Sequence, residues 1–263
     1  MPAYLVITAD DFGRSAEANR RIVQAHRDGI VTAASLMVAE RGAGEAAALA
    51  QGTELDVGLH VTLSDGFALE HVRPLTDAGG RFRQHPAQAG LAYWFRQGLR
   101  PLVQREVEAQ FRRFSSLRQP CSHVDGHQHL HIHPVVWRAV TRCCREYGVR
   151  WVRVPFEEWR PMGRVPVSRP IEWAAIRAVG GWCRRQALSE GLRVADRVYG
   201  LVLSGQMTEE RLIATLRTLQ SGVSEVYAHP GVNEDELDAV CSERVRDVIR
   251  KSGLILTGFS GMP

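Results

Sequence analysis

From the first residues onward, the spacing of apolar positions switches between the period of two that is typical of strands and the period of about 3.6 that is typical of helices. Residues 3–8 form a short, apolar, β-rich run that predicts a buried strand. Ser15 is placed to cap a helix that ends at Gly29, and residues 30–38 again have the composition of a strand. This first stretch therefore predicts a strand–helix–strand unit with parallel strands.

Predicted strands and helices continue to alternate along the whole chain. Further strands are predicted at 57–63, 122–125, 149–154, 198–203, 223–228 and 254–259. Further helices are predicted at 44–51, 102–117, 134–148, 171–188, from 208 onward and at 235–252, and the proline-rich residues 157–170 predict a long loop. Sustained alternation predicts an α/β fold, and about seven such units favour a closed or nearly closed TIM-like barrel of parallel strands. Since no internal repeat or linker interrupts the pattern, residues 1–263 are predicted to form a single domain.

Composition and charge narrow the class of protein. Of the 263 residues, 44% are apolar and 24% charged, as expected for a globular domain with a full core. The net charge of +4 comes from scattered basic residues, almost all arginine, so we expect no nucleic-acid partner, although this charge favours anionic membranes or substrates. Five cysteines without a CxxC spacing favour the reducing cytoplasm, and we expect neither a signal peptide nor a membrane span.

Half of the ten histidines lie within one short segment. Together with Asp125, they all occupy odd-numbered positions, and they are His123, His127, His129, His131 and His133. In an extended segment this spacing would put all six side chains on one face, which predicts a metal site whose imidazoles the aspartate orients. We expect a function for His123, His127 and His129, whereas His131 and His133 fit a helix entry or the surface equally well because Pro134 follows them.

Two carboxylates, Asp10 and Asp11, directly follow the first predicted strand. Adjacent side chains on extended backbone point to opposite sides, so we expect the two to have different roles. One would bind a metal ion, and the other would act as a general base on water. The structural alternative is a solvated turn or a helix cap, because aspartate is common in both.

Two further histidines lie within or directly after apolar strands. His60 lies within 57–63, where an imidazole needs a polar partner, and His229 directly follows 223–228. A hydrogen-bonded core histidine and a fold-stabilising turn are the structural alternatives. Because the carboxyl ends of parallel barrel strands meet at one mouth, Asp10, Asp11, His60, His127 and His229 are predicted to converge there.

The motifs of several other enzyme classes are absent. The chain has no P-loop, no GxGxxG after a strand, no GxSxG and no HExxH. Nucleotide-dependent enzymes, α/β-hydrolases and zincin proteases would require these motifs. The first strand also ends in Asp-Asp rather than His-x-His, which disfavours amidohydrolase-type metal barrels.

Three separated blocks of the sequence are Thr8-Ala9-Asp10-Asp11-Phe12-Gly13, Val57-Gly58-Leu59-His60-Val61-Thr62-Leu63 and His123-Val124-Asp125-Gly126-His127-Gln128-His129-Leu130-His131. Together they resemble the signature motifs of the YdjC-like carbohydrate deacetylases. The later Ala228-His229-Pro230-Gly231 extends the resemblance over nearly the whole chain, and Gly126 departs from the serine that is frequent in the family. The resemblance implies a distorted (β/α) barrel and metal-dependent removal of an N-acetyl group from an amino sugar.

The resemblance also implies a role for each matched residue. Asp11, His60 and His127 would be the metal ligands, Asp10 the general base and His229 the general acid. It implies magnesium as the divalent ion, whereas two imidazoles and one carboxylate suit zinc or another transition metal better. Residues 91–96 and 171–182 are similar to segments of the family's branch that is associated with hopanoid biosynthesis. This similarity implies a lipid-linked amino sugar as substrate and contact with a membrane face.

The leading prediction is therefore a cytoplasmic hydrolase of an N-acetylated amino sugar with one divalent metal ion, and we expect a homodimer. Two alternatives stay open. A metal-dependent phosphoesterase is favoured by the positive charge, but the sequence lacks a second carboxylate-rich cluster for a two-metal site. A non-catalytic metal- or sugar-binding protein would bind its ligands without releasing acetate.

Overall fold

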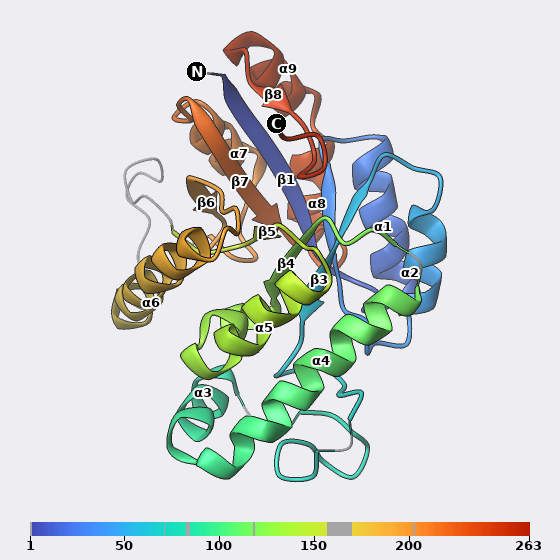
Figure 1. Ribbon diagram of the computed structural model, residues 1–263. Helices are drawn as coiled ribbons and strands as arrows, with labels where there is room; N and C mark the ends of the chain where they lie inside the picture. The colour runs from blue at the N-terminus through green and yellow to red at the C-terminus, as the bar shows by residue number, and fades with distance from the viewer. Residues whose placement is uncertain (1, 71, 83–84, 118, 157–169, 202) are drawn as a thin grey trace.

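The computed structural model describes residues 2–70, 72–82, 85–117, 119–156, 170–201 and 203–263 (Figure 1). The strands are β1 (Ala3–Phe12), β2 (Ala33–Leu36), β3 (Asp56–Val61), β4 (His123–Gly126), β5 (Trp151–Val152), β6 (Arg197–Tyr199), β7 (Gly222–Ala228) and β8 (Ile255–Leu256). The helices are α1 (Ala16–Arg27), α2 (Ala43–Ala50), α3 (Pro86–Phe95), α4 (Arg100–Ser116), α5 (Pro134–Glu146), α6 (Pro170–Ser189), α7 (Glu209–Leu216), α8 (Glu234–Cys241) and α9 (Glu243–Ser252). Two short 3₁₀ helices are η1 (Gln97–Leu99) and η2 (His127–Ile132).

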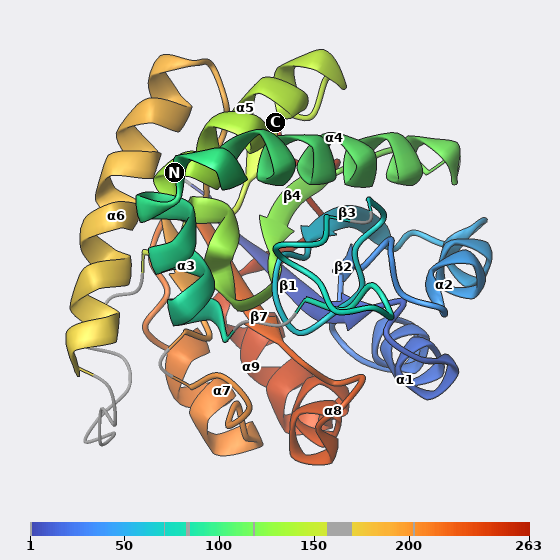
Figure 2. The same cartoon turned by 90° about the horizontal axis from the view of Figure 1, so that it is seen from below.

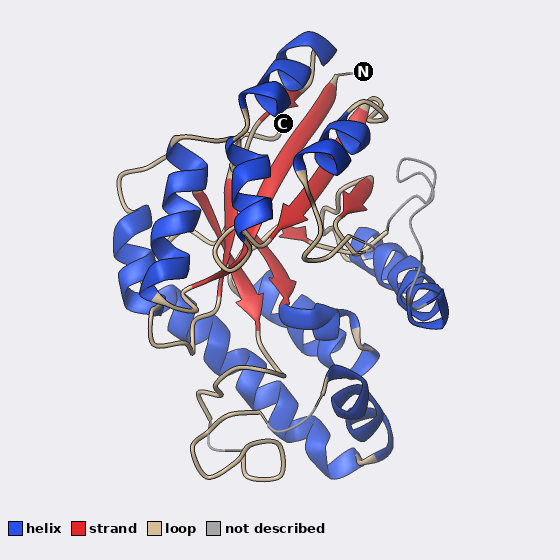
Figure 3. Cartoon of the chain, turned by 180° about the vertical axis from the view of Figure 1, so that it is seen from behind, coloured by secondary structure: helices blue, strands red, loops and turns tan. Residues whose placement is uncertain are grey.

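One curled parallel sheet forms the centre of the molecule. The strand order is β5-β4-β3-β2-β1-β7-β6, and β8 pairs with β1 beside this path. Each of these pairings is parallel. The strand arrows therefore run in a common direction, away from the end of the molecule that holds both chain termini (Figure 3). Residues that follow the strands are thus gathered at the opposite end.

The predicted α/β fold with a barrel-like parallel sheet is confirmed. The seven strands of the main path curl through a half-barrel, and helices surround the sheet on its outer side (Figure 2). Among the described residues, the edge strands β5 and β6 form no ladder with each other, but an isolated parallel bridge joins Trp151 of β5 to Arg193, and the Val198 N–H of β6 donates to the Phe156 carbonyl. The central strands β1 to β4 are buried on both faces, which explains this architecture, because helices must cover the outer face of a parallel sheet.

Three local predictions differ from the structure. The predicted helix 235–252 is wrong as a single helix, because the backbone is extended at Ser242 and its hydroxyl caps α9 by accepting from the backbone N–H groups of Arg244 and Val245. Helix α3 was not predicted at all. Strand β1 extends to Phe12 rather than ending at residue 8, so both aspartates belong to the strand itself. The predicted loop 157–170 lies almost entirely outside the described residues.

The core is one continuous apolar cluster between the sheet and its helices. Helix α5 illustrates how the sequence builds it, since Val136, Trp137 and Val140 lie on one stripe and are fully buried. The predicted cap of α1 is confirmed, because the Ser15 hydroxyl accepts a hydrogen bond from the Ala18 N–H. No helix in the described part of the chain is both long and apolar enough to span a membrane.

Gly58 in β3 allows a close approach that a larger residue would prevent. A Cβ atom at this position would lie 2.4 Å from the His123 ring. We predict that Gly58→Ala lowers the free energy of unfolding by about 1–3 kcal/mol, because the ring or the backbone must move. Urea denaturation measures the change. Gly44→Ala in α2 is the matched control, since no atom lies within 4 Å of its Cβ position, and an equal loss in this control would contradict the prediction.

Candidate active site

The carboxyl end of β1 separates its two aspartates. The register with β2 shifts between Ala9 and Phe12, and Asp11 has a left-handed backbone with φ of 67°. This irregularity directs the two carboxylates to different partners: Asp10 contacts Arg153, whereas Asp11 contacts histidines. The two carboxylates thus have different partners, and the different roles expected for them stay a prediction.

Asp11, His60 and His127 form a buried cluster that could hold a metal ion. One ligand atom from each lies within 4.8 Å of the other two. Asp11 Oδ1 is 3.0 Å from His127 Nδ1 and 3.5 Å from His60 Nε2. The predicted convergence of these three residues is therefore observed, because β3 carries His60 and His127 directly follows β4.

The chemistry of this donor set fits a divalent cation. Asp11 Oδ1 is buried and lacks a well-formed hydrogen bond among the described residues, as a ligand atom reserved for an ion would. Burial raises the pKa of the Asp11 carboxyl, but the nearby His127 and His60 outweigh this and hold the pKa well below its usual range. An ionised carboxylate and two imidazoles are ligands for zinc and other transition ions.

Asp125 orients His60 toward this cluster. Its Oδ1 atom is 2.7 Å from His60 Nδ1, which leaves Nε2 facing Asp11. A carboxylate on the far nitrogen of a ligating imidazole fixes the ring's tautomer and orientation. The other oxygen of Asp125 accepts a hydrogen bond from Ser35 Oγ at 2.7 Å. Burial lowers the pKa of His60, but Asp125, Asp10 and Asp11 together outweigh this effect, and the net shift is upward.

Arg153 is a residue of the site that sequence reasoning missed. It follows β5, is fully buried, and donates to both oxygens of Asp10 at 2.7 and 2.9 Å. It also lies 2.8 Å from Asp125 Oδ2 and 2.8 Å from Glu225 Oε1. An arginine inside the apolar predicted strand 149–154 was the available signal, because a buried guanidinium requires carboxylate partners.

His229 lies close enough to Asp10 and Asp11 for their charges to act on its ring, and it has an acidic partner of its own, Glu236. Its Nδ1 atom is 3.3 Å from Oε2 of Glu236, a buried residue of α8. Burial lowers the pKa of His229, but Glu236 together with Asp10 and Asp11 raises it to about 9. Sequence reasoning also missed Glu236, for which the local pattern gave only an acidic first turn of a helix.

The odd-numbered alternation of the histidine-rich segment ends at Gly126. There the chain leaves β4 and enters η2, in which Gln128 and His129 have left-handed backbones with φ of 53° and 57°. The single histidine-bearing face expected for an extended segment is therefore wrong. His127 alone of the five histidines joins the Asp11 cluster.

The other four histidines have partners of their own. His123, for which we expected a function, lies 3.1 Å from Ser35 Oγ through Nε2 and 2.9 Å from Ser122 Oγ through Nδ1, so neither ring nitrogen is left for an ion. Burial lowers its pKa to about 4, which keeps the ring neutral. His129 contacts the Tyr227 hydroxyl at 2.9 Å, and His133 caps α5.

His131 explains the glycine at position 126. Its Nε2 atom is 2.8 Å from the carbonyl oxygen of Arg153, and burial lowers its pKa to about 4. A Cβ at Gly126 would lie 2.8 Å from the His131 side chain. The neutral ring thus fills the space that a side chain at position 126 would need.

The family model described as YdjC-like protein matches residues 4–251. A carbohydrate deacetylase of Mus musculus is 34% identical over 86% of this chain and 77% of its own length. One of Geobacillus stearothermophilus is 30% identical over 94% of this chain and 89% of its own length.

A solved structure from Enterococcus faecalis V583, named for cellobiose-phosphate cleavage, has the same fold. Its TM-score is 0.72 at 18% identity, over 99% of this chain and 98% of the other. The family match covers the strand ends that carry both aspartates, His60, His127 and His229. The chain belongs to the YdjC-like family.

Proposed function

We propose that this protein is a metal-dependent carbohydrate deacetylase that hydrolyses the N-acetyl group of an amino sugar. The observation that carries the proposal is the grouping of the Asp11, His60 and His127 cluster with Asp10 and His229 at one end of the sheet. The relatives named carbohydrate deacetylase support the same activity.

Asp11, His60 and His127 would hold the ion. When bound, a divalent ion would polarise the acetamide carbonyl and make water a stronger nucleophile at neutral pH. Family resemblance favours magnesium, but the two imidazoles favour zinc or another transition-metal ion. We therefore propose a transition-metal ion, zinc included.

Asp10 is the proposed general base. Arg153 holds both of its oxygens, so the carboxylate has a fixed position, and each oxygen keeps a second lone pair for a proton. In the reaction, Asp10 takes one proton from the attacking water while the water oxygen forms a bond to the carbonyl carbon. The C–N bond then breaks, which yields acetate and the free amine.

His229 is the proposed general acid. Glu236 occupies its Nδ1 side, so Nε2 is the nitrogen that delivers a proton to the departing amine. A pKa of about 9 keeps the ring protonated at neutral pH, as an acid requires.

The phosphoesterase alternative has less support. The second group of possible ligands is Asp10, His60 and Asp125. The Arg153 guanidinium already lies between these two carboxylates, at 2.7 and 2.8 Å, and supplies the positive charge there. In the described residues this leaves one cluster for an ion rather than two.

Some narrower features stay predictions. As the resemblance to the hopanoid-associated branch implies, we propose that the amino sugar is carried on a lipid. A homodimer and a cytoplasmic location are expectations from the sequence alone.

Metal removal should abolish the activity. We predict that a chelator stops acetate release from N-acetylated sugars and that one divalent ion restores it. His127→Ala and Asp11→Asn should each lower metal affinity by more than about tenfold, because each removes a ligand. Isothermal titration with Zn²⁺ and Mn²⁺ measures this. The exposed His85 provides the control His85→Gln, and wild-type affinity in His127→Ala would disprove the ligand assignment.

The proposed base and acid should be needed for turnover but not for metal binding. Asp10→Asn and His229→Ala should each lower kcat by about 10²–10⁴-fold while the protein still binds its ion. Acetate release and metal titration are measured on the same samples, and thermal melting checks that each variant is folded. Asp235→Asn, on the same helix as Glu236, is the control. Near-normal kcat in either variant would exclude its assigned role.

Glu236 should set the pKa of His229. In the metal-free protein, Glu236→Gln should move this pKa from about 9 toward the ordinary 6.5, by roughly one unit or more, and NMR titration of the ring measures it. The raised pKa stabilises the fold fully below about pH 6.5, and this contribution is lost as the pH rises through 9, so the variant should be less stable at neutral pH. The exposed Glu234 gives the control Glu234→Gln, and an unchanged His229 pKa in Glu236→Gln would refute the coupling.

A further inference from the structure

Helix α3 presents an apolar face to solvent. Leu91, Trp94 and Phe95 have i, i+3 and i+4 spacing and expose 61%, 53% and 76% of their surface. The same helix is fixed to the protein on its other side, where Ala89 and Tyr93 are buried and the Tyr93 hydroxyl donates to the Leu63 carbonyl. The exposed face is therefore held in place by a packed one.

The chain around this helix is strongly basic. Between Asp77 and Glu106 the sequence contains five arginines and no acidic residue. Arg96 and Arg100 directly follow the exposed face and are themselves exposed. This charge complements an anionic surface rather than a neutral or basic one.

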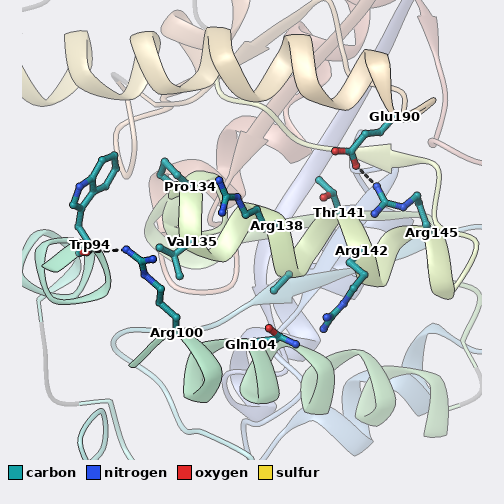
Figure 4. Close-up of a pocket in the computed structure, with 11 residues that line it drawn as sticks. Trp94, Arg100, Gln104, Pro134, Val135, Arg138, Thr141, Arg142, Arg145 and Glu190 are labelled. Carbon is teal, nitrogen blue, oxygen red and sulfur yellow. Dashed lines mark hydrogen bonds and ion pairs between the residues drawn. The ribbon is translucent and has the colours of Figure 1, made fainter. Parts of the chain in front are cut away.

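A hollow of about 700 Å³ adjoins the exposed face (Figure 4). Trp94 and Arg100 line it on one side, and α5 lines it with Arg138, Arg142 and Arg145. Two of these arginines are paired with carboxylates, Arg142 with Glu108 and Arg145 with Glu190.

Arg100 and Arg138 have no such partner in the part of the chain that the structure describes. Within the described ranges, the one hydrogen bond of Arg100 goes to the Trp94 carbonyl, at 3.3 Å. Two guanidinium groups beside an exposed indole can bind phosphate oxygens while the ring contacts apolar chains.

The extent of this surface distinguishes between possible occupants. The exposed parts of Leu91, Trp94 and Phe95 together offer on the order of 400 Å², judged from typical side-chain areas. A stable protein dimer needs about 800 Å² from each partner. Aromatic and aliphatic side chains flanked by arginine are typical of helices that lie at a membrane interface.

We propose that α3 and the adjoining Arg100–Arg138 hollow bind an anionic lipid bilayer. Leu91, Trp94 and Phe95 enter the headgroup region, and Arg100 and Arg138 bind lipid phosphates. Trp94 also contacts the ring of His133, which directly follows η2 and its His127, so the bound bilayer lies on the side of the molecule that carries the metal cluster. The proposal does not depend on the hydrolase activity.

Vesicle sedimentation tests the proposal with the full-length protein. We expect at least about tenfold tighter binding to phosphatidylcholine vesicles containing phosphatidylglycerol than to pure phosphatidylcholine, with affinity falling as salt rises. The double variant Leu91→Ser/Phe95→Ser should lose at least about tenfold in affinity, and Arg100→Glu/Arg138→Glu should lose the preference for anionic vesicles. Leu49→Ser/Ile255→Ser removes exposed apolar residues elsewhere and should bind as the wild type does.

Three results would overturn the proposal. They are no vesicle binding, equal binding to both vesicle types, and undiminished binding by Leu91→Ser/Phe95→Ser. A dimer that dissociates in the same variant, without vesicle binding, would assign the face to a second copy of the chain instead. Acetate release from a water-soluble N-acetylated sugar should be unchanged in this variant, so failure of the lipid proposal and failure of the deacetylase proposal are distinguishable.

Discussion

The buried guanidinium of Arg153 is the charge on which the arrangement of the site depends. It contacts Asp10 from β1, Asp125 from β4 and Glu225 from β7, so it joins three strands that are far apart in the sequence. Carboxylates placed in the interior without such a partner would be strongly unfavourable. Buried ion pairs add little net stability compared with apolar packing, so the main effect of this group is to fix the direction of Asp10 and, through Asp125, of His60.

The separation of Asp11 from this network leaves it to form the cluster with His60 and His127 in which we propose that a metal ion binds. The irregular register at the end of β1 and the left-handed backbone of Asp11 direct its carboxylate away from Arg153. Aspartate tolerates this backbone better than most residues. Asp10, Asp11 and Asp125 are three buried carboxylates, of which Arg153 contacts Asp10 and Asp125. Arg14 reaches Asp11 from a less buried position at 3.0 Å. This excess of negative charge favours a cation beside Asp11 Oδ1.

The sequence predicts the parts of this site that follow from strand order. Asp10, Asp11, His60, His127 and His229 each lie at or near the carboxyl end of an apolar strand, and parallel strands bring such ends together. Arg153 and Glu236 could not be assigned in this way, because their roles come from long-range contacts that a local pattern does not encode. Helix α3 was missed for a related reason: it is apolar on both its buried and its exposed face, so it has no helical period to detect.

The histidine-rich segment differs from its predicted form because the chain turns there rather than continuing as a strand. Two successive left-handed residues, Gln128 and His129, cost roughly 1–2 kcal/mol each, so other contacts must hold them. Ser64 donates to the Gln128 side chain at 2.7 Å, and His129 contacts Tyr227. This turn places His127 against Asp11 and sends the following residues back toward Arg153, whose carbonyl His131 contacts. The five histidines are therefore not interchangeable donors: His127 joins Asp11, whereas His129 and His131 contact Tyr227 and Arg153 from the turn that positions it.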